Sequence, residues 1–357
     1  MASAGGSQKY ATQINQQAID GFRYTFSNDR LIALNFSTNT YPHHHWFLMN
    51  KLWCLLSFTI LFPVVACAQD KGWEEKKTRF KPLAEEKIAA INSAIPSQAT
   101  AKPKQTRRVL AFFRCEGFIH GSIPFGNEAL KQMAKKTKAF EVDLADTYDV
   151  FSKENLSKYD GIVLNNTTHM KFPEASQQIA FMDFISNGGG LAGFHAASDN
   201  FSRHPDCLAL VGGVFNGHPW GAGGTWAFKL DDPDHVLNKA FEGKGFWHQD
   251  EIYQYKPDSF QGEDNLRILV SLDMSKEMVS GRITDGPREV PVSWIRTAGK
   301  GRVFYTNLGH RSETFHNPMI LRHMLDGIQY SLGDLEADAV PTAKAGKKEK
   351  ALAPAKK

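Results

Sequence analysis

One glycine-rich stretch near the middle of the chain limits the possible folds more than any other. Its triple glycine, residues 188–190, is typical of a helix end, because glycine adopts the left-handed C-cap conformation without a steric penalty. Residues 191–194 form a short apolar run that favours a buried parallel strand. His195 follows, with the small residues Gly193 and Ala197 on either side. We therefore predict a tight strand-to-helix turn, with strained backbone and an imidazole at the mouth of a pocket.

Segments typical of strands and helices alternate on both sides of this turn. Such alternation specifies a parallel sheet with right-handed crossovers, and we therefore predict an α/β fold with a doubly wound, mostly parallel sheet of the flavodoxin-like type. We expect strands at 109–113, 140–145, 163–164, 226–230, 251–255 and 266–272, and an added β-hairpin made of 291–297 and 301–307. We expect helices at 84–94, 124–136, 152–158, 173–187 and 318–332.

The two ends of the chain differ in composition from this body. We expect residues 1–48 to be a mispredicted N-terminal extension, 49–68 an export signal, 69–107 a charged linker, 108–334 the folded domain and 335–357 a disordered tail rich in Ala, Lys and Pro. Nine basic and four acidic residues in 71–107, and six basic and one acidic in 340–357, give each flank a charge of +5. The net charge of +4 therefore leaves −6 for the rest, which argues against a nucleic-acid-binding domain.

The export signal is predicted from three consecutive features. Met49 opens a short basic region, an apolar run follows, and small residues around Cys67 and Ala68 form a cleavage site. The sequence before Cys67 is similar to a bacterial lipobox, and cleavage after Ala68 fits equally well, so a lipid anchor at Cys67 stays one of two alternatives. Both place the mature protein outside the cytoplasm, either periplasmic or anchored to a bacterial membrane. Cys54 also lies in the export segment, and the two cysteines of the body, Cys115 and Cys207, lack the spacing of a redox or metal motif.

Polar residues recur where the predicted topology places loops above the strand ends. Histidine is the side chain whose unperturbed pKa lies nearest neutrality, so histidines at strand ends are candidates for proton transfer or metal binding. A carboxylate one helical turn after His195, at Asp199, is expected to orient its ring. The candidates are His120, His195, Asp199, His218, Trp220, Asp250, Glu251, Tyr253 and His310.

Several of these candidates lie in motifs that resemble those of the ThuA (trehalose utilisation) family. The motifs, in chain order, are residues 188–201 (GGGLAGFHAASDNF), 210–219 (LVGGVFNGHP), 250–253 (DEIY) and 299–310 (GKGRVFYTNLGH). The resemblance covers about residues 108–334 and implies the fold of class I glutamine amidotransferases. The catalytic cysteine of those relatives is replaced here by His195, so glutaminase chemistry is not implied. Ile119 stands where the family's first-loop motif usually has arginine.

The resemblance also implies a link to sugars, and three hypotheses follow. In the first, a hydrolase, lyase or isomerase acts on trehalose, another disaccharide or a keto-sugar, with His195, Asp199 and Glu251 catalytic. The residues expected to bind the sugar are His120, His218, Trp220, Asp250, Tyr253 and His310. In the second, the chain is a non-catalytic sugar-binding or scaffolding module.

In the third hypothesis a divalent metal such as zinc lies between His195, His218 and His310, with Asp199 or Glu251 as an oxygen ligand. No other cofactor is predicted.

Overall fold

The computed structural model describes residues 71–356, apart from positions 203 and 287. The extension at 1–48, the export signal at 49–68 and the alternative lipid anchor at Cys67 lie outside the described residues. Among the described residues, no helix combines the length and the apolar character needed to cross a bilayer.

The described residues form a nine-stranded sheet in the order β2-β1-β3-β4-β9-β8-β7-β5-β6. The strands are β1 Arg108–Phe112, β2 Glu141–Ala145, β3 Gly161–Asn165, β4 Gly190–Phe194, β5 Thr225–Leu230, β6 Phe246–Gln249, β7 Arg267–Leu272, β8 Pro291–Ala298 and β9 Gly301–Thr306. The helices are α1 Lys71–Lys76, α2 Glu85–Ala94, α3 Ile123–Thr137, α4 Lys153–Leu156, α5 Ala175–Ser186, α6 Pro205–Val211, α7 Gly262–Asn265, α8 Glu277–Ser280 and α9 Pro318–Ser331.

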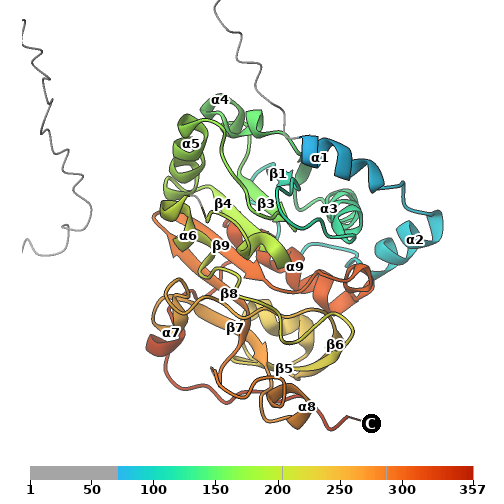
Figure 1. Ribbon diagram of the computed structural model, residues 1–357, viewed down its shortest axis with the longest axis vertical. Helices are drawn as coiled ribbons and strands as arrows, with labels where there is room; N and C mark the ends of the chain where they lie inside the picture. Colours follow the sequence, from blue (N-terminus) through green and yellow to red (C-terminus); the bar gives the residue numbers. More distant parts are fainter. Residues whose placement is uncertain (1–70, 203, 287, 357) are drawn as a thin grey trace, which may run out of the picture. The chain divides into compact units, whose positions relative to one another are not determined.

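The sheet has a parallel half and an antiparallel half, which meet at β9. Strands β2, β1, β3, β4 and β9 are parallel to one another, whereas β9, β8, β7, β5 and β6 pair antiparallel. The predicted doubly wound α/β fold is confirmed. The predicted hairpin is β8–β9. It links the parallel half to an antiparallel extension that continues beyond the hairpin through β7, β5 and β6 (Figure 1).

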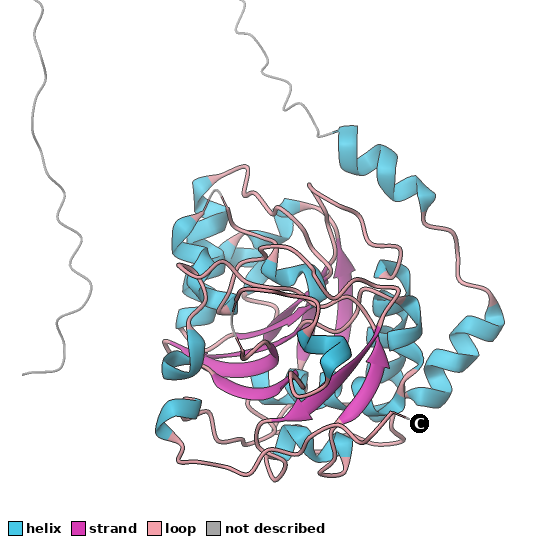
Figure 2. Cartoon of the chain, turned by 60° about the horizontal axis from the view of Figure 1, so that its bottom comes forward, coloured by secondary structure: helices cyan, strands magenta, loops and turns pink. Residues whose placement is uncertain are grey.

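Helices cover both faces of the parallel half, because its strands alternate apolar side chains between two cores. One core joins Val109, Ala111, Val163 and Ala192 to helices α2, α3 and α9. The other joins the alternate strand residues to α5 and α6, and Phe181 of α5 lies fully buried in it. Figure 2 shows the strands running between these helical layers. The site loops therefore leave from one end of a sheet that is buried on both faces.

Three segments differ from expectation. Residues 251–255 make only isolated bridges with a neighbouring loop, and the strand before them is β6. The linker packs on the body, since Arg107 pairs with Asp334 at 2.7 Å. The predicted disordered tail is wrong: Ala351 exchanges two backbone hydrogen bonds with Leu230, and Ala353 is buried.

Candidate functional site

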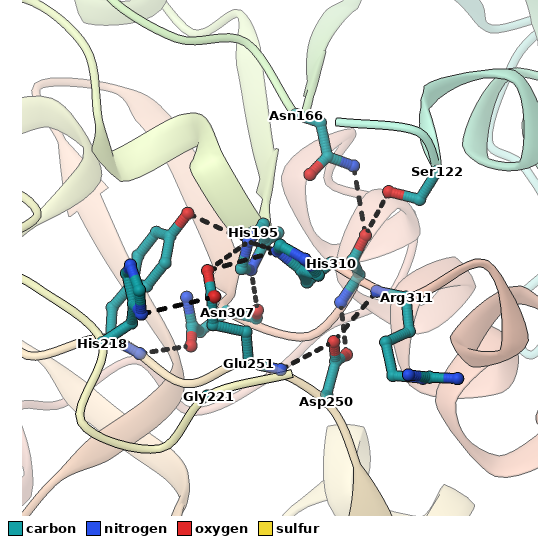
Figure 3. A network of polar contacts seen from close by, with 12 residues as sticks. Ser122, Asn166, His195, His218, Gly221, Asp250, Glu251, Asn307, His310 and Arg311 are labelled. Carbon is teal, nitrogen blue, oxygen red and sulfur yellow. Dashed lines mark hydrogen bonds and ion pairs between the residues drawn. The ribbon is translucent and has the colours of Figure 1, made fainter. Parts of the chain in front are cut away.

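Four polar side chains meet at the carboxyl end of the parallel strands, and Figure 3 shows three of them, His195, Glu251 and His310. His120 lies in the loop after β1, His195 directly follows β4, and His310 lies four residues after β9. Glu251 comes from the loop after β6, in the antiparallel half. Because β1, β3, β4 and β9 are neighbours, their C-terminal loops converge on this edge of the sheet.

His195 occupies the tight turn predicted for it. Its φ of 44° lies in the left-handed region, which confirms the expected backbone strain. A Cβ atom added at Gly193 would lie 2.9 Å from the Cβ of Ala197, so glycine is required by close approach. Two expectations are wrong. The imidazole is fully buried rather than exposed at a pocket mouth, and residues 195–198 form one 3-10 turn rather than the start of an α-helix.

Both ring nitrogens of His195 have defined neighbours. Nδ1 lies 2.7 Å from the main-chain oxygen of Asn307, while Nε2 lies 2.9 Å from the Tyr253 hydroxyl and 3.2 Å from Nδ1 of His310. Because a carbonyl only accepts hydrogen bonds, Nδ1 carries the proton and Nε2 has the lone pair. The prediction that Asp199 orients this ring is wrong, since its carboxylate pairs instead with His169 at 3.4 Å.

Glu251 connects His195 and His310 to the half-exposed His218. Its Oε1 lies 3.2 Å from Nδ1 of His310 and 3.7 Å from Nε2 of His195. Its Oε2 lies 3.4 Å from Nδ1 of His218, whose side chain is 52% exposed. One carboxylate therefore contacts imidazoles on the inner and outer sides of the site.

Burial is the main electrostatic influence on His195 and His120. It lowers the pKa of His195 well below the usual value, and the neighbouring rings of His120 and His310 add to the effect. Burial likewise lowers the pKa of His120 to about 3, with a further contribution from His310. Both imidazoles are therefore neutral near pH 7, and their lone pairs are available to a proton donor or a cation.

Asp250 positions the loops rather than facing a ligand. Its fully buried carboxylate accepts hydrogen bonds from the backbone N–H of Gly309, Arg311 and Glu251 and from the Thr314 hydroxyl. Burial raises its pKa to about 6, and these donors oppose that shift. The prediction that Asp250 binds substrate is wrong, because all its accepting positions face protein donors.

Trp220, expected to contact a sugar, belongs to the core. It is fully buried, and its indole N–H donates to the main-chain oxygen of Val279. The exposed aromatic residue at the site is Phe118, which is 65% exposed and lies edge to face with His120 at 4.8 Å between ring centroids. The sequence could have indicated that Phe118 belongs to the site, because it lies two residues before His120 in a loop that follows a strand.

His218 and Tyr253 reach the site through two loops that pair with each other. Backbone bridges join Phe215 to Tyr255 and Trp220 to Ile252, and the two candidates lie between those bridges. The Tyr253 N–H donates to Oδ1 of Asn307 at 2.9 Å, which anchors the loop beside β9. Tyr253 is buried, and its hydroxyl faces His195.

Two residues of the site were missed at the level of sequence. Asn307 holds His195 through its main-chain oxygen and Tyr253 through its side chain. The Tyr305 hydroxyl donates to the main-chain oxygen of His195 at 2.7 Å and also lies 3.0 Å from Oγ of Ser198. Both residues lie in the Tyr-Thr-Asn-Leu-Gly-His segment that ends at His310. Their position at the end of a strand could have indicated that they belong to the site.

Among the described residues, one group has the composition of a metal centre. One donor atom from each of His120, His195, Glu251 and His310 lies within 4.8 Å of the others. The set differs from the sequence expectation, because His120 takes the place given to His218 and Asp199 is absent from it.

Comparison with known families identifies the chain. The family model described as ThuA, trehalose utilisation, matches residues 108–331, well over half of the sequence. The chain belongs to the ThuA family. Comparison with functionally curated proteins gives no match.

Two solved ThuA-like structures resemble this ThuA-family chain. That from Bacteroides uniformis is 22% identical, with a TM-score of 0.51, and the match covers 69% of this chain and 99% of the other. That from Parabacteroides merdae is 19% identical, also with a TM-score of 0.51, over 69% and 98% of the two chains. At these identities the likeness supports the fold alone.

Cysteine chemistry does not suit this ThuA-family protein. Cys115 and Cys207 are buried free thiols rather than a disulfide. Burial raises the pKa of each to about 12, so neither is a thiolate at neutral pH. The turn after β4 carries an imidazole, and the groups in this site suited to proton transfer are His195, Glu251 and His218.

Proposed function

We propose that this ThuA-family protein is an enzyme that acts on a sugar, with trehalose, related disaccharides and their keto forms as the substrate class. The observation that carries the proposal is the double contact of Glu251. Its Oε1 faces the inner histidines, and its Oε2 faces His218. A proton taken from a sugar hydroxyl, or from a carbon beside a sugar carbonyl, can pass through this carboxylate to a half-exposed imidazole and on to solvent.

The roles we propose follow the burial of each group. Glu251 is the general base, and His218 exchanges the proton with water. The Asn307 carbonyl holds the His195 ring in the tautomer whose Nε2 lone pair faces the cluster formed with Glu251 and His310. Phe118 offers an exposed aromatic face at the rim, on which the apolar face of a sugar ring can pack.

The test is turnover by the full chain of trehalose, related disaccharides and their 3-keto forms. In Glu251→Gln we expect kcat to fall by about 10²- to 10⁴-fold, as is typical for loss of a general base. Asp199→Asn is the matched control, since Asp199 pairs with His169, and we expect less than a threefold change. Sugar binding without turnover of any substrate by the folded protein would contradict the proposal and favour a binding module.

We also propose that the protein is exported, which residues 49–68 support. Cell fractionation of the full-length protein tests this, and a cytoplasmic location would contradict it. Cys67→Ser separates the two alternatives, because the substitution abolishes membrane association only if Cys67 bears a lipid.

A further inference from the structure

The inner part of the site has the donor spacing of a metal centre. Nδ1 of His310 lies 3.2 Å from both Nε2 of His195 and Oε1 of Glu251, and those two atoms are 3.7 Å apart. A tetrahedral ion with bonds of about 2.0–2.1 Å holds its ligand atoms about 3.3 Å apart. We propose that His120, His195, Glu251 and His310 bind one divalent first-row transition metal, such as zinc. This inference rests on the proposed function, whose site it deepens.

The hydrogen bond at the back of the His195 ring supports this assignment. Nδ1–H donates to the main-chain oxygen of Asn307, so Nε2 keeps its lone pair, which faces the Tyr253 hydroxyl together with His310 and Glu251. Metal-bound histidines almost always donate the other ring N–H to a carbonyl or carboxylate in this way. The ring also follows directly on a buried strand, and so its direction is fixed before any ion binds.

His120 provides an independent second observation. Its side chain is only 3% exposed, yet Nδ1 has no hydrogen-bond partner among the described residues. Its ring lies edge to face with those of His195 and His310, at 4.8 and 5.0 Å between centroids. A buried polar nitrogen without a partner is unfavourable, because it has lost its hydrogen bonds to water. Coordination of an ion in this cluster would place a partner beside the otherwise unsatisfied ring.

The donor types narrow the class of ion. Three imidazole nitrogens and one carboxylate oxygen suit zinc, iron, manganese or cobalt, whereas calcium and magnesium require mostly oxygen ligands. The proton path proposed above is preserved, because Oε1 of Glu251 faces the cluster and Oε2 faces His218. A bound ion would supply Lewis-acid polarisation of a sugar or water oxygen.

The experiment measures metal on the full chain prepared without an affinity tag. The sequence has a run of three histidines at 43–45, so every protein carries His43→Ala, His44→Ala and His45→Ala to remove that background. The chelator-treated protein is titrated with Co²⁺ and followed by visible absorption. Metal content after loading with Zn²⁺ is measured by mass spectrometry. We expect about one equivalent of either ion, with the Co²⁺ bands of a nitrogen- and oxygen-ligated site.

Two substitutions test the ligand set. His120→Asn and Glu251→Gln should each weaken Co²⁺ binding by at least the roughly 10- to 100-fold that loss of an outer-shell partner costs. His169→Asn is the matched control, because His169 pairs with Asp199 outside the cluster, and it should bind Co²⁺ as the parent does. Circular dichroism of each metal-free variant establishes that it is folded.

The outcomes separate this inference from the proposed function. Less than one-tenth of an equivalent of metal on folded parent protein would overturn the metal site. Unchanged Co²⁺ binding in His120→Asn or Glu251→Gln would overturn the assigned ligands. Sugar turnover that survives complete removal of metal would leave the proposed function intact and would overturn the role of the ion in it. Stoichiometric metal without sugar turnover would support the metal site and contradict the proposed function.

Discussion

At the scale of single residues, the site depends on a glycine that allows no side chain. The backbone of Gly193 approaches the turn that carries His195, and an added Cβ would lie 2.9 Å from the Cβ of Ala197 and 3.2 Å from Cδ2 of Tyr305. Tyr305 in turn donates its hydroxyl to the main-chain oxygen of His195. A methyl group at this position therefore displaces the residues that hold the imidazole.

We expect Gly193→Ala to lower the free energy of unfolding by about 1–3 kcal/mol, the usual effect of overpacking a close contact. Urea denaturation followed by tryptophan fluorescence measures it. Adding Ala197→Gly removes the nearest methyl group and should recover part of the loss. Gly223→Ala serves as control, because nothing lies within 4 Å of its added Cβ. Equal stability of Gly193→Ala and the parent would refute the steric argument.

At the scale of elements, the Asp250 carboxylate joins two loops that come from different halves of the sheet. It accepts hydrogen bonds from Gly309, Arg311 and Thr314 of the loop after β9, and its own chain continues directly to Glu251. His310 lies between two of those donors. The distance between Glu251 and His310 is therefore set by this one buried carboxylate.

In Asp250→Asn an NH2 group replaces one of the two carboxylate oxygens. This NH2 group faces hydrogen-bond donors and cannot accept from them. We expect a loss of about 1–3 kcal/mol in the free energy of unfolding, the cost of leaving buried donors unsatisfied. Glu313→Gln makes the same chemical change on an exposed side chain of the same loop and should alter stability by less than about 0.5 kcal/mol. Thermal unfolding of both variants provides the comparison, and similar melting temperatures would disprove the special role of Asp250.

The sequence was sufficient to predict the helices and strands of the parallel half, because local patterns determine them. The triple glycine and the apolar run after it correctly predict α5, β4 and the strained turn at His195. The antiparallel half depends on distant contacts. Residues 251–255 look like a strand by composition, but the backbone donors that fix this loop lie about 60 positions later, at Gly309 and Arg311, and the Asp250 carboxylate accepts from them.

Predictions from the sequence were also wrong for residues whose surroundings are determined by tertiary contacts. Composition favours the core for Trp220 over a sugar site, and its full burial and hydrogen bond to the Val279 carbonyl place it in the core. The lysine- and alanine-rich tail docks because Ala351 pairs with Leu230 and the Ala353 N–H reaches the Asp273 carboxylate. Small side chains permit that close approach, and their spacing carries no periodic signal.

At the scale of the whole molecule, buried histidines make stability depend on pH. His323 in α9 is fully buried between Oγ of Ser293 and the main-chain oxygen of Leu237. Burial lowers its pKa to about 4 in the folded protein, against about 6.5 in the unfolded chain. Between these values the unfolded chain binds a proton that the folded protein does not. Stability from this group is therefore complete above pH 6.5 and is lost as the pH falls to 4.

We expect His323→Gln to be less stable than the parent at pH 7, with a difference that shrinks by up to about 3 kcal/mol as the pH falls from 7 to 4. Urea unfolding at intervals of half a pH unit gives both curves. A difference that stays constant over this range would show that His323 is not protonated on unfolding.

During synthesis from the N-terminus, β9 is the last strand to leave the ribosome, yet its place is between β4 and β8. Until it is inserted, both of those strands expose an edge of unpaired backbone, a form in which sheets aggregate readily. A nascent chain paused before residue 301 would therefore depend on chaperones for protection. His310 also arrives with this strand, so the four-residue cluster can form only after the whole sheet has closed.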